Sequence, residues 1–381
     1  MNAASVILLE FHPERDDLGK DKELRDGLSV AVQIGDTLWV TNDETISLER
    51  LSLVEGGNTG TYRYGRHHKQ FSLNDYLRLP VKPRDPADLE EADVEGLVYE
   101  DGYLWLVGSH SLKRKKPKLK DGAEKAQEQL AQVRRDGNRY LLARIPVVER
   151  DGTYTLVKVD TQNGKKRTAA QLRGNDQGND LTKVLRGDEH LGSFLAIPGK
   201  DNGFDIEGLA VVGERLFLGL RGPVLRGWAV ILEVELKEEN ERSSTLRLQA
   251  IGPNGRLYRK HFLSLGGLGI RDLCAQGADL LILAGPTMDL DGPVTVFRWP
   301  GGTDPNGEKM VPASELERVL EVPYGQGVDH AEGMTLFSPD GGTVRSLLVV
   351  YDSASERRQL GESTVAADVF PLPRTFEPRR A

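Results

Sequence analysis

The sequence DIEGL at residues 205–209 opens an apolar run, and related stretches organise the whole chain. Four further copies match it closely or loosely: DVEGL at 93–97, HAEGM at 330–334, RDGL at 25–28 and IRDL at 270–273. After each apolar run, a polar turn such as 100–102 leads to a second apolar run such as 104–107. The repeat predicts pairs of short antiparallel strands.

The spacing of the copies predicts the architecture. Measured at Gly27, Gly96, Gly208, Asp272 and Gly333, the intervals are 69, 112, 64 and 61 residues. Each interval has room for two more strands, and four short antiparallel strands per repeat are typical of a propeller blade. We therefore expect an all-β, five-bladed β-propeller that occupies residues 1–381 as a single domain. Residues 6–11 would complete the last blade. A sixth blade inside the longest interval and two β-sandwich domains are the alternatives.

The longest interval contains an insertion. Residues 111–139 hold a basic run from Lys113 to Lys120, followed by apolar residues at helical spacing from Ala123 to Val133. The segment predicts a helical insertion in the second blade. Two interpretations remain open, a lid over the channel mouth and a solvated loop. A second short helix is expected from Asp180 to Leu185.

Composition narrows the function classes. The chain has 381 residues with 50 Lys+Arg against 58 Asp+Glu, a net charge of -8, which disfavours binding to nucleic acid or to membrane surfaces. Cys274 is the only cysteine, so no intramolecular disulfide forms, and no apolar run is long enough for a signal peptide or a membrane span. We expect a cytoplasmic protein whose partner is an anionic small molecule or another protein.

Polar residues gather at one rim of the predicted propeller, because the first strand of each blade begins where the second ends. There, four carboxylates are candidate ligands of a divalent cation, most plausibly Ca²⁺: Glu95, Glu207, Asp272 and Glu332. Arg221 would orient an anion, and His110 would move protons. Four more residues are candidate ligand contacts: Asp93, Asp205, Arg271 and His330. Metal-assisted hydrolysis of a phosphoester or a similar anion is the resulting hypothesis.

Other interpretations of the same residues stay open. In one interpretation, each carboxylate of the ring accepts hydrogen bonds from backbone amides of the adjacent blade. The glycine that follows it then allows a close approach of main chains or a positive φ. Arg221 would form a salt bridge to Glu207. Two carboxylates would act as a glycosidase-like pair. The rim of a non-catalytic scaffold would instead bind a protein.

These motifs also carry a resemblance. FDIEGLA at 204–210, GLRGP at 219–223 and HAEGM at 330–334 resemble the bacterial family called domain of unknown function 3616, from about Ser29 to Asp352. More distantly, the strand openings are similar to those of the esterase-like phytase propellers. The first resemblance implies a propeller fold, and the second implies a cation and a phosphoester. The pair Arg271 and Asp272 departs from the glutamate pattern.

Overall fold

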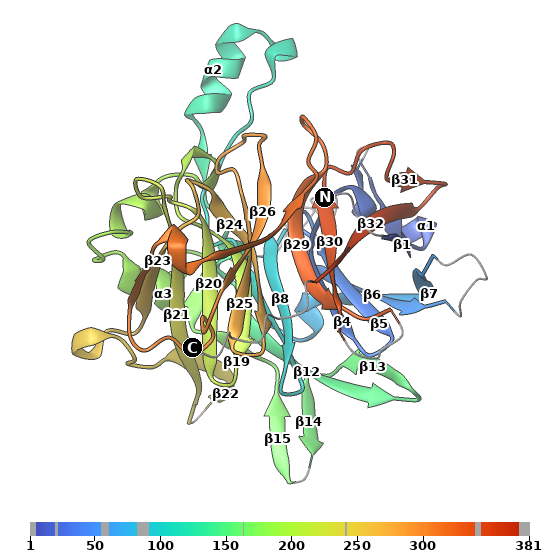
Figure 1. Ribbon diagram of the computed structural model, residues 1–381, viewed down its shortest axis with the longest axis horizontal. Helices are drawn as coiled ribbons and strands as arrows, with labels where there is room; N and C mark the ends of the chain where they lie inside the picture. Colours follow the sequence, from blue (N-terminus) through green and yellow to red (C-terminus); the bar gives the residue numbers. More distant parts are fainter. Residues whose placement is uncertain are drawn as a thin grey trace.

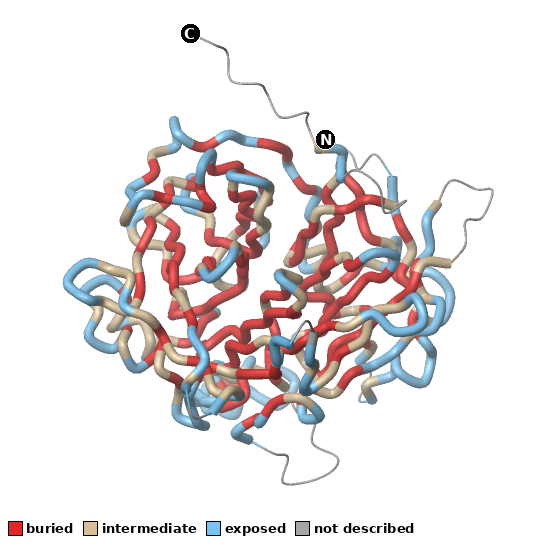
Figure 2. The backbone as a smooth tube through the Cα atoms, turned by 90° about the horizontal axis from the view of Figure 1, so that it is seen from below, coloured by how far each residue is buried: buried red, intermediate tan, exposed pale blue. Residues whose placement is uncertain are grey.

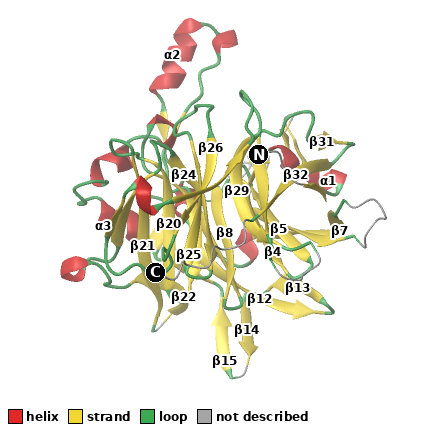
Figure 3. Ribbon diagram, viewed as in Figure 1, coloured by secondary structure: helices red, strands yellow, loops and turns green. Residues whose placement is uncertain are grey.

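The computed structural model describes residues 5–19, 22–54, 61–81, 91–162, 164–240, 242–339 and 344–372. The protein is mostly β-structure (Figures 1 and 3). Three short α-helices are present in this part of the chain: α1 (Pro13–Asp16), α2 (Ala123–Ala131) and α3 (Asp180–Leu185). None of these described helices has the length and apolar character of a membrane span.

The first two groups of antiparallel strands follow the order of the chain. The first group contains β4 (Leu28–Ile34), β5 (Thr37–Asn42), β6 (Ser47–Leu53) and β7 (Arg63–Ser72). The second contains β8 (Val94–Glu100), β9 (Tyr103–Gly108), β12 (Leu142–Arg150), and both β13 (Thr153–Leu156) and β16 (Ala170–Leu172) beside β12.

The other groups repeat this order. The third contains β19 (Asp205–Val212), β20 (Arg215–Gly222), β21 (Trp228–Glu239), and both β22 (Arg242–Leu248) and β23 (Arg259–Ser264) beside β21. The fourth contains β24 (Gly269–Gln276), β25 (Asp279–Gly285), β26 (Val294–Trp299) and β28 (Glu317–Val322). The fifth contains β29 (His330–Phe337), β30 (Ser346–Asp352), β32 (Thr364–Pro371) and β1 (Ser5–Glu10).

Short strands decorate these groups. They form three local hairpins and two edge additions: β2 (Asp17–Gly19) with β3 (Lys22–Glu23), β14 (Val159–Gln162) with β15 (Lys165–Thr168), β17 (Gly174–Asn175) with β18 (Gly178–Asn179), β27 (Lys309–Val311) on β23, and β31 (Gln359–Leu360) on β32.

The N-terminal strand closes the fifth group, as the sequence predicted. β1 pairs antiparallel with β32 from Ser5 opposite Val369 to Glu10 opposite Thr364. It also pairs in parallel with β7 of the first group. The first and last parts of the described chain therefore share one sheet, which leaves no unpaired edge between them.

The inner strands β4, β8, β19, β24 and β29 contact one another in that order, and β29 returns to β4. Five apolar clusters lie between successive groups, including one between the fifth group and the first. The buried backbone occupies the inside of the molecule, and exposed loops surround it (Figure 2). This arrangement is propeller-like.

Glycines allow the inner strands to approach closely. A Cβ atom at Gly96 would lie 2.5 Å from the Leu209 Cβ, and one at Gly333 would lie 2.6 Å from the Ser29 carbonyl oxygen. Side chains at these positions would overlap their neighbours, which is why the repeat keeps glycine there. At these two positions, the structure confirms that the repeat glycine allows neighbouring inner strands to approach closely.

Each inner strand carries a β-bulge near its start. The pairing register skips one residue in every case: Ser29, Glu95, Glu207, Arg271 and Glu332. Val30, Gly96 and Asp272 each follow the skipped residue directly, so these three positions are equivalent in the repeat. Gly27 is therefore not the counterpart of Gly96, and our alignment of the first copy was wrong by three residues. Arg271 occupies the ring position that the sequence analysis gave to Asp272.

The insertion between β9 and β12 forms an arm. β10 (Lys113–Arg114) pairs with β11 (Val133–Arg134), and α2 lies between them in the chain. The helix agrees with the predicted one, but it projects away from the body instead of lying over it (Figure 1). The lid interpretation therefore does not describe this structure.

Short strands also project at the opposite rim. There, β13 and the hairpin of β14 and β15 extend beyond the sheets on the side away from α2 (Figure 1). Helix α3 has its predicted bounds, and Asn179 forms a capping box with Thr182 at its start.

Candidate functional site

The five bulges bring distant residues to one end of the inner strands. A bulge re-aims the extra side chain out of the regular alternation, and bulges often occur beside functional sites. The ring formed by Glu95, Glu207, Arg271 and Glu332, together with Ser29, combines three acidic side chains with one basic side chain. We call the residues around this ring the mouth.

One half of the mouth is an ion-paired network. Arg221 Nη1 donates to Glu207 Oε1 at 2.6 Å, and Arg221 Nη2 donates to the Met288 carbonyl. Arg271 Nη1 lies 2.8 Å from Glu332 Oε1 and 3.4 Å from Glu207 Oε2. Both arginines are buried. The alternative interpretation of Arg221 as a structural salt bridge to Glu207 matches this geometry.

The other half contains carboxyl groups without cations. Neither Glu95 nor Asp43 forms a hydrogen bond or an ion pair within the described part of the chain. Burial raises the pKa of Glu95 well above its usual range, and the charges of Asp93, Glu207 and Glu332 add to the effect. Burial and the charge of Asp352 raise the pKa of Asp43 in the same way. A positive charge close to these groups would lower their pKa values again.

Asp93 and Asp205 lie beside the second half. Asp93 pairs with Arg139 at 2.9 Å. Arg139 also donates to Ser111 Oγ at 2.9 Å and contacts Glu91. Burial and the neighbouring Glu207 raise the pKa of Asp205 to about 8, so its carboxyl group is protonated at neutral pH. A protonated carboxyl group is a proton donor.

Asp272 has a different environment from its predicted one. Its Oδ1 accepts from the Leu273 amide and its Oδ2 from the Met334 amide, each at 2.7 Å, and the Leu209 amide contributes as well. Leu209 and Met334 belong to the two neighbouring inner strands. The backbone-amide interpretation holds at this position, and main-chain donors take up the carboxylate that we expected to bind a cation.

His110 is held on both ring nitrogens. Its Nδ1 contacts the Gly108 carbonyl at 2.7 Å, and its Nε2 contacts the Asn179 side-chain amide at 2.7 Å. Burial lowers the pKa of His110 to about 4. A neutral ring with both nitrogens engaged links the β9 end to the start of α3 and leaves neither nitrogen for a ligand.

His330 lies at the edge of the mouth between two carboxylates. Its Nε2 is 3.0 Å from Asp291 Oδ1, and its Nδ1 is 3.9 Å from Asp352 Oδ2. Asp352 raises the pKa of His330, with burial opposing and Asp291 assisting. Burial and Asp352 raise the pKa of the neighbouring Glu332 to about 7. Glu332 therefore changes charge near neutral pH.

Sequence reasoning missed Arg139, Lys200 and Asp291. Arg139 and Asp291 lie outside the repeated strands, and Lys200 lies in a turn before the third copy. No repeated signal marks them. Asp43 directly follows the second strand of the first copy, which places it at this rim in the sequence as well, but it was not nominated as a ligand. Among the described residues, no three His, Cys, Asp or Glu side chains are grouped closely enough to hold a metal ion.

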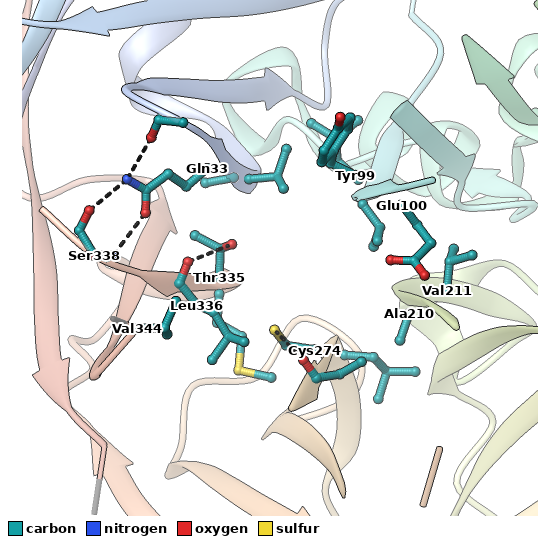
Figure 4. A pocket seen from close by; sticks show the side chains of 18 residues that line it. Gln33, Tyr99, Glu100, Ala210, Val211, Cys274, Thr335, Leu336, Ser338 and Val344 are labelled. Atoms are coloured by element: carbon teal, nitrogen blue, oxygen red, sulfur yellow. Dashed lines mark hydrogen bonds between the residues drawn. The ribbon is translucent and has the colours of Figure 1, made fainter. Parts of the chain in front are cut away.

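The channel between the inner strands opens as a cavity on the side away from the mouth. Its volume is about 340 Å³, and residues of all five inner strands line it (Figure 4). Burial raises the pKa of the lining thiol, Cys274, to about 12, so the thiol is protonated. Gln33 closes part of the wall by exchanging hydrogen bonds with the Ser338 main chain (Figure 4).

The chain belongs to a known family. Residues 27–368 match the family described as protein of unknown function (DUF3616), which confirms the resemblance seen in the sequence. No curated protein matches the chain in sequence.

Among solved structures, the chain is similar to three enzymes at low identity. The glutaminyl cyclase of Myxococcus xanthus is 7% identical with a TM-score of 0.38, covering 98% of this chain and 97% of that one. A streptogramin B lyase is 9% identical with a TM-score of 0.35, covering 98% and 100%. The PQQ-bound aldose sugar dehydrogenase of Streptomyces coelicolor is 11% identical with a TM-score of 0.32, covering 97% and 100%. At these values, neither activity nor ligand transfers to this chain.

Proposed function

We propose that the protein is a five-bladed β-propeller whose mouth binds a divalent cation. The blade number is supported by five inner strands in cyclic contact and by five apolar clusters between successive groups. The observation that supports the cation is the unpaired carboxyl group of Glu95 among Asp43, Asp93 and Glu332. Carboxylate oxygens are the ligands that Ca²⁺ prefers.

Glu95 and Asp43 would hold the ion, with Glu332 contributing charge nearby. These groups fit a cation because each has a pKa raised by burial and by other carboxylates, a cost that a bound ion would remove. Glu207 and Asp272, which the sequence nominated, already have partners. Two carboxylates leave the rest of the coordination shell to water and substrate.

Hydrolysis of a phosphoester or a similar anion is the reaction we propose for this site. A bound cation would polarise the anion and offset its charge. Lys200 would orient the anion in place of Arg221, because its side chain is 67% exposed and its charge interacts with those of Glu332 and Asp352. Asp205 would donate a proton to the leaving group, since its carboxyl group stays protonated up to about pH 8.

Calcium titration of chelator-treated protein tests the cation site. We expect Ca²⁺ to raise the melting temperature at constant ionic strength. At a Ca²⁺ concentration of 100 times the Kd, the free energy of unfolding should rise by about 2.7 kcal/mol. The double variant Glu95→Gln/Asp43→Asn should lose this shift. The matched control Glu149→Gln, an exposed carboxylate on β12, should keep it. The proposed site would be contradicted if Ca²⁺ raised the melting temperature equally in the double variant and in the control, or if it did not raise that of the wild type.

Hydrolysis is tested separately with p-nitrophenyl phosphate and its diester. We expect turnover that depends on Ca²⁺ or Mn²⁺ and falls at least tenfold in Asp205→Asn. Cation binding without turnover of either ester would support the proposed cation site and contradict the proposed hydrolysis.

A second candidate function is a non-catalytic scaffold that binds an acidic protein. The observation in its favour is the projecting arm, where residues 111–139 hold ten Lys or Arg against four Asp or Glu, a net charge of +6 in a chain of net charge -8. The arm also exposes apolar side chains, with Leu119 81% and Leu130 45% exposed. Exposed apolar groups beside like charges are typical of a contact surface.

Poly-L-glutamate is a probe for this second candidate. We expect salt-sensitive binding that the triple variant Lys115→Gln/Lys116→Gln/Lys118→Gln removes. The control triple variant Lys237→Gln/Lys309→Gln/Arg357→Gln changes exposed charges elsewhere and should bind as the wild type does. Equal loss in both variants would mean that net charge, and not the arm, attracts the probe.

A further inference from the structure

A cleft separates the second and third groups of strands at their outer edges. Its volume is about 1010 Å³, close to the upper limit for small-molecule sites. Most of its walls come from three stretches that are distant in the sequence, residues 76–80, 168–176 and 242–245, and residues 137–141 and 158–159 complete the lining. None of its lining residues belongs to the mouth, so the cleft is independent of the proposed cation site.

The walls of the cleft are held rigidly. The Gln171 side-chain amide accepts from the Arg78 N–H at 2.8 Å and donates to the Arg78 carbonyl at 2.9 Å. Asn138 does the same with Val81, at 2.9 and 3.1 Å. The parallel pairing of Gln171 with Thr245 joins the other two walls. These contacts preform the cleft, which lowers the entropic cost of binding a ligand.

Positive charge lines this cleft. The charged lining residues are Arg78, Lys158, Arg173, Arg242 and Asp176. Arg173 pairs with Asp180 at 3.1 Å. The side chains of Arg78, Lys158 and Arg242 form no hydrogen bond or ion pair with any residue that the structure describes. A chain with a net charge of -8 therefore presents three unpaired cations to one concave space.

The lining also offers neutral hydrogen-bonding groups. Ser243, Ser244 and Thr245 contribute hydroxyl groups, and Leu77 and Pro80 form an apolar part of the wall. Arginine forks bind phosphate and carboxylate groups through paired hydrogen bonds, while hydroxyl groups satisfy the remaining oxygens. An apolar wall suits the carbon skeleton of such a ligand.

We propose that this cleft binds a small polyanion, a molecule that carries two or more phosphate or carboxylate groups. Arg78 and Arg242 line the cleft from two distant stretches of the chain, and Lys158 adds a third positive charge.

Isothermal titration calorimetry with pyrophosphate and with citrate tests the proposal and separates the two anion chemistries. In 150 mM NaCl we expect binding of at least one probe and a Kd at least tenfold weaker in Arg78→Gln/Arg242→Gln. The control Lys309→Gln/Arg357→Gln removes two exposed charges elsewhere and should bind as the wild type does.

The melting temperature of each variant is measured in parallel. If the cleft double variant is destabilised, the single variants Arg78→Gln and Arg242→Gln replace it, because each side chain lacks protein partners in the described structure. No heat with either probe at 10 mM, or equal affinity in the cleft and control variants, would overturn the proposal.

Discussion

The two halves of the mouth use the same strand opening for different purposes. In the half around Glu207 and Glu332, Arg271 occupies a bulge position and lies between two carboxylates. In the half around Glu95, the bulge residue is itself acidic, and the charges that act on it include those of Asp93 and Asp43. The comparison teaches that position in the repeat decides where a side chain is aimed, while its neighbours decide its charge state.

Arg271→Ala should give the largest effect, because it converts the paired half into an unpaired one. It leaves Glu207 and Glu332 without their shared cation, and breaking a buried ion pair costs about 3–5 kcal/mol. Urea unfolding measures this loss. The exposed Arg357→Ala, with an expected change of under about 0.5 kcal/mol, is the control. A loss no greater than that of the control would mean that the network is not stabilising.

Asp272→Ala should follow in size. It removes the acceptor of amides on two neighbouring inner strands, and buried donors left unsatisfied cost about 1–3 kcal/mol each. Asp272→Asn retains one acceptor oxygen and should lose less. Thermal melts of both variants check this order, and a reversed order would contradict the amide contacts.

The pH dependence of stability should report the buried carboxyl groups of the mouth. Asp205 and Glu332 have pKa values of about 8 and about 7 in the folded protein, against about 4 when unfolded. The folded state binds more protons between pH 4 and 8, so its stability falls as the pH rises through that window.

We therefore expect the melting temperature of the cation-free protein to be several degrees lower at pH 8.5 than at pH 5. Asp205→Asn should flatten the profile, and saturating Ca²⁺ should reduce its slope. A melting temperature that rises across this range in the wild type would contradict the assigned environments.

Glu95→Gln should produce the smallest change and the opposite sign. Removing a carboxyl group that other carboxylates oppose should stabilise the cation-free protein by about 1 kcal/mol at pH 8 and by nothing at pH 5. Guanidinium unfolding at both pH values measures it. Destabilisation at pH 8 would show that Glu95 has a favourable partner.

Much of the fold was predictable because it repeats. The strand pairs, the closing strand β1, and helices α2 and α3 follow from local patterns and from the need to pair a sheet edge. The first copy was misaligned because Gly27 resembles the repeat glycine, whereas the bulge lies at Ser29. Bulges depend on how two strands pair, which one strand's sequence does not show.

The candidate site was predicted in place but not in detail. Glu95, Glu207 and Glu332 do converge, as equal spacing around an axis requires. Other contacts of the mouth come from outside the repeated strands and follow no common pattern. Examples are Arg139 beside Asp93, Asp291 beside His330, and Asn179 beside His110.

The amino-acid sequence alone predicts that the chain is mostly β-structure, that it repeats, and that acidic residues recur at the strand openings. Those properties are written into composition and periodicity, which act locally. Only the tertiary structure decided which carboxylates are neutralised by arginine, which by backbone amides, and which by nothing. Charge compensation depends on distances of a few ångströms between residues that are far apart in the chain.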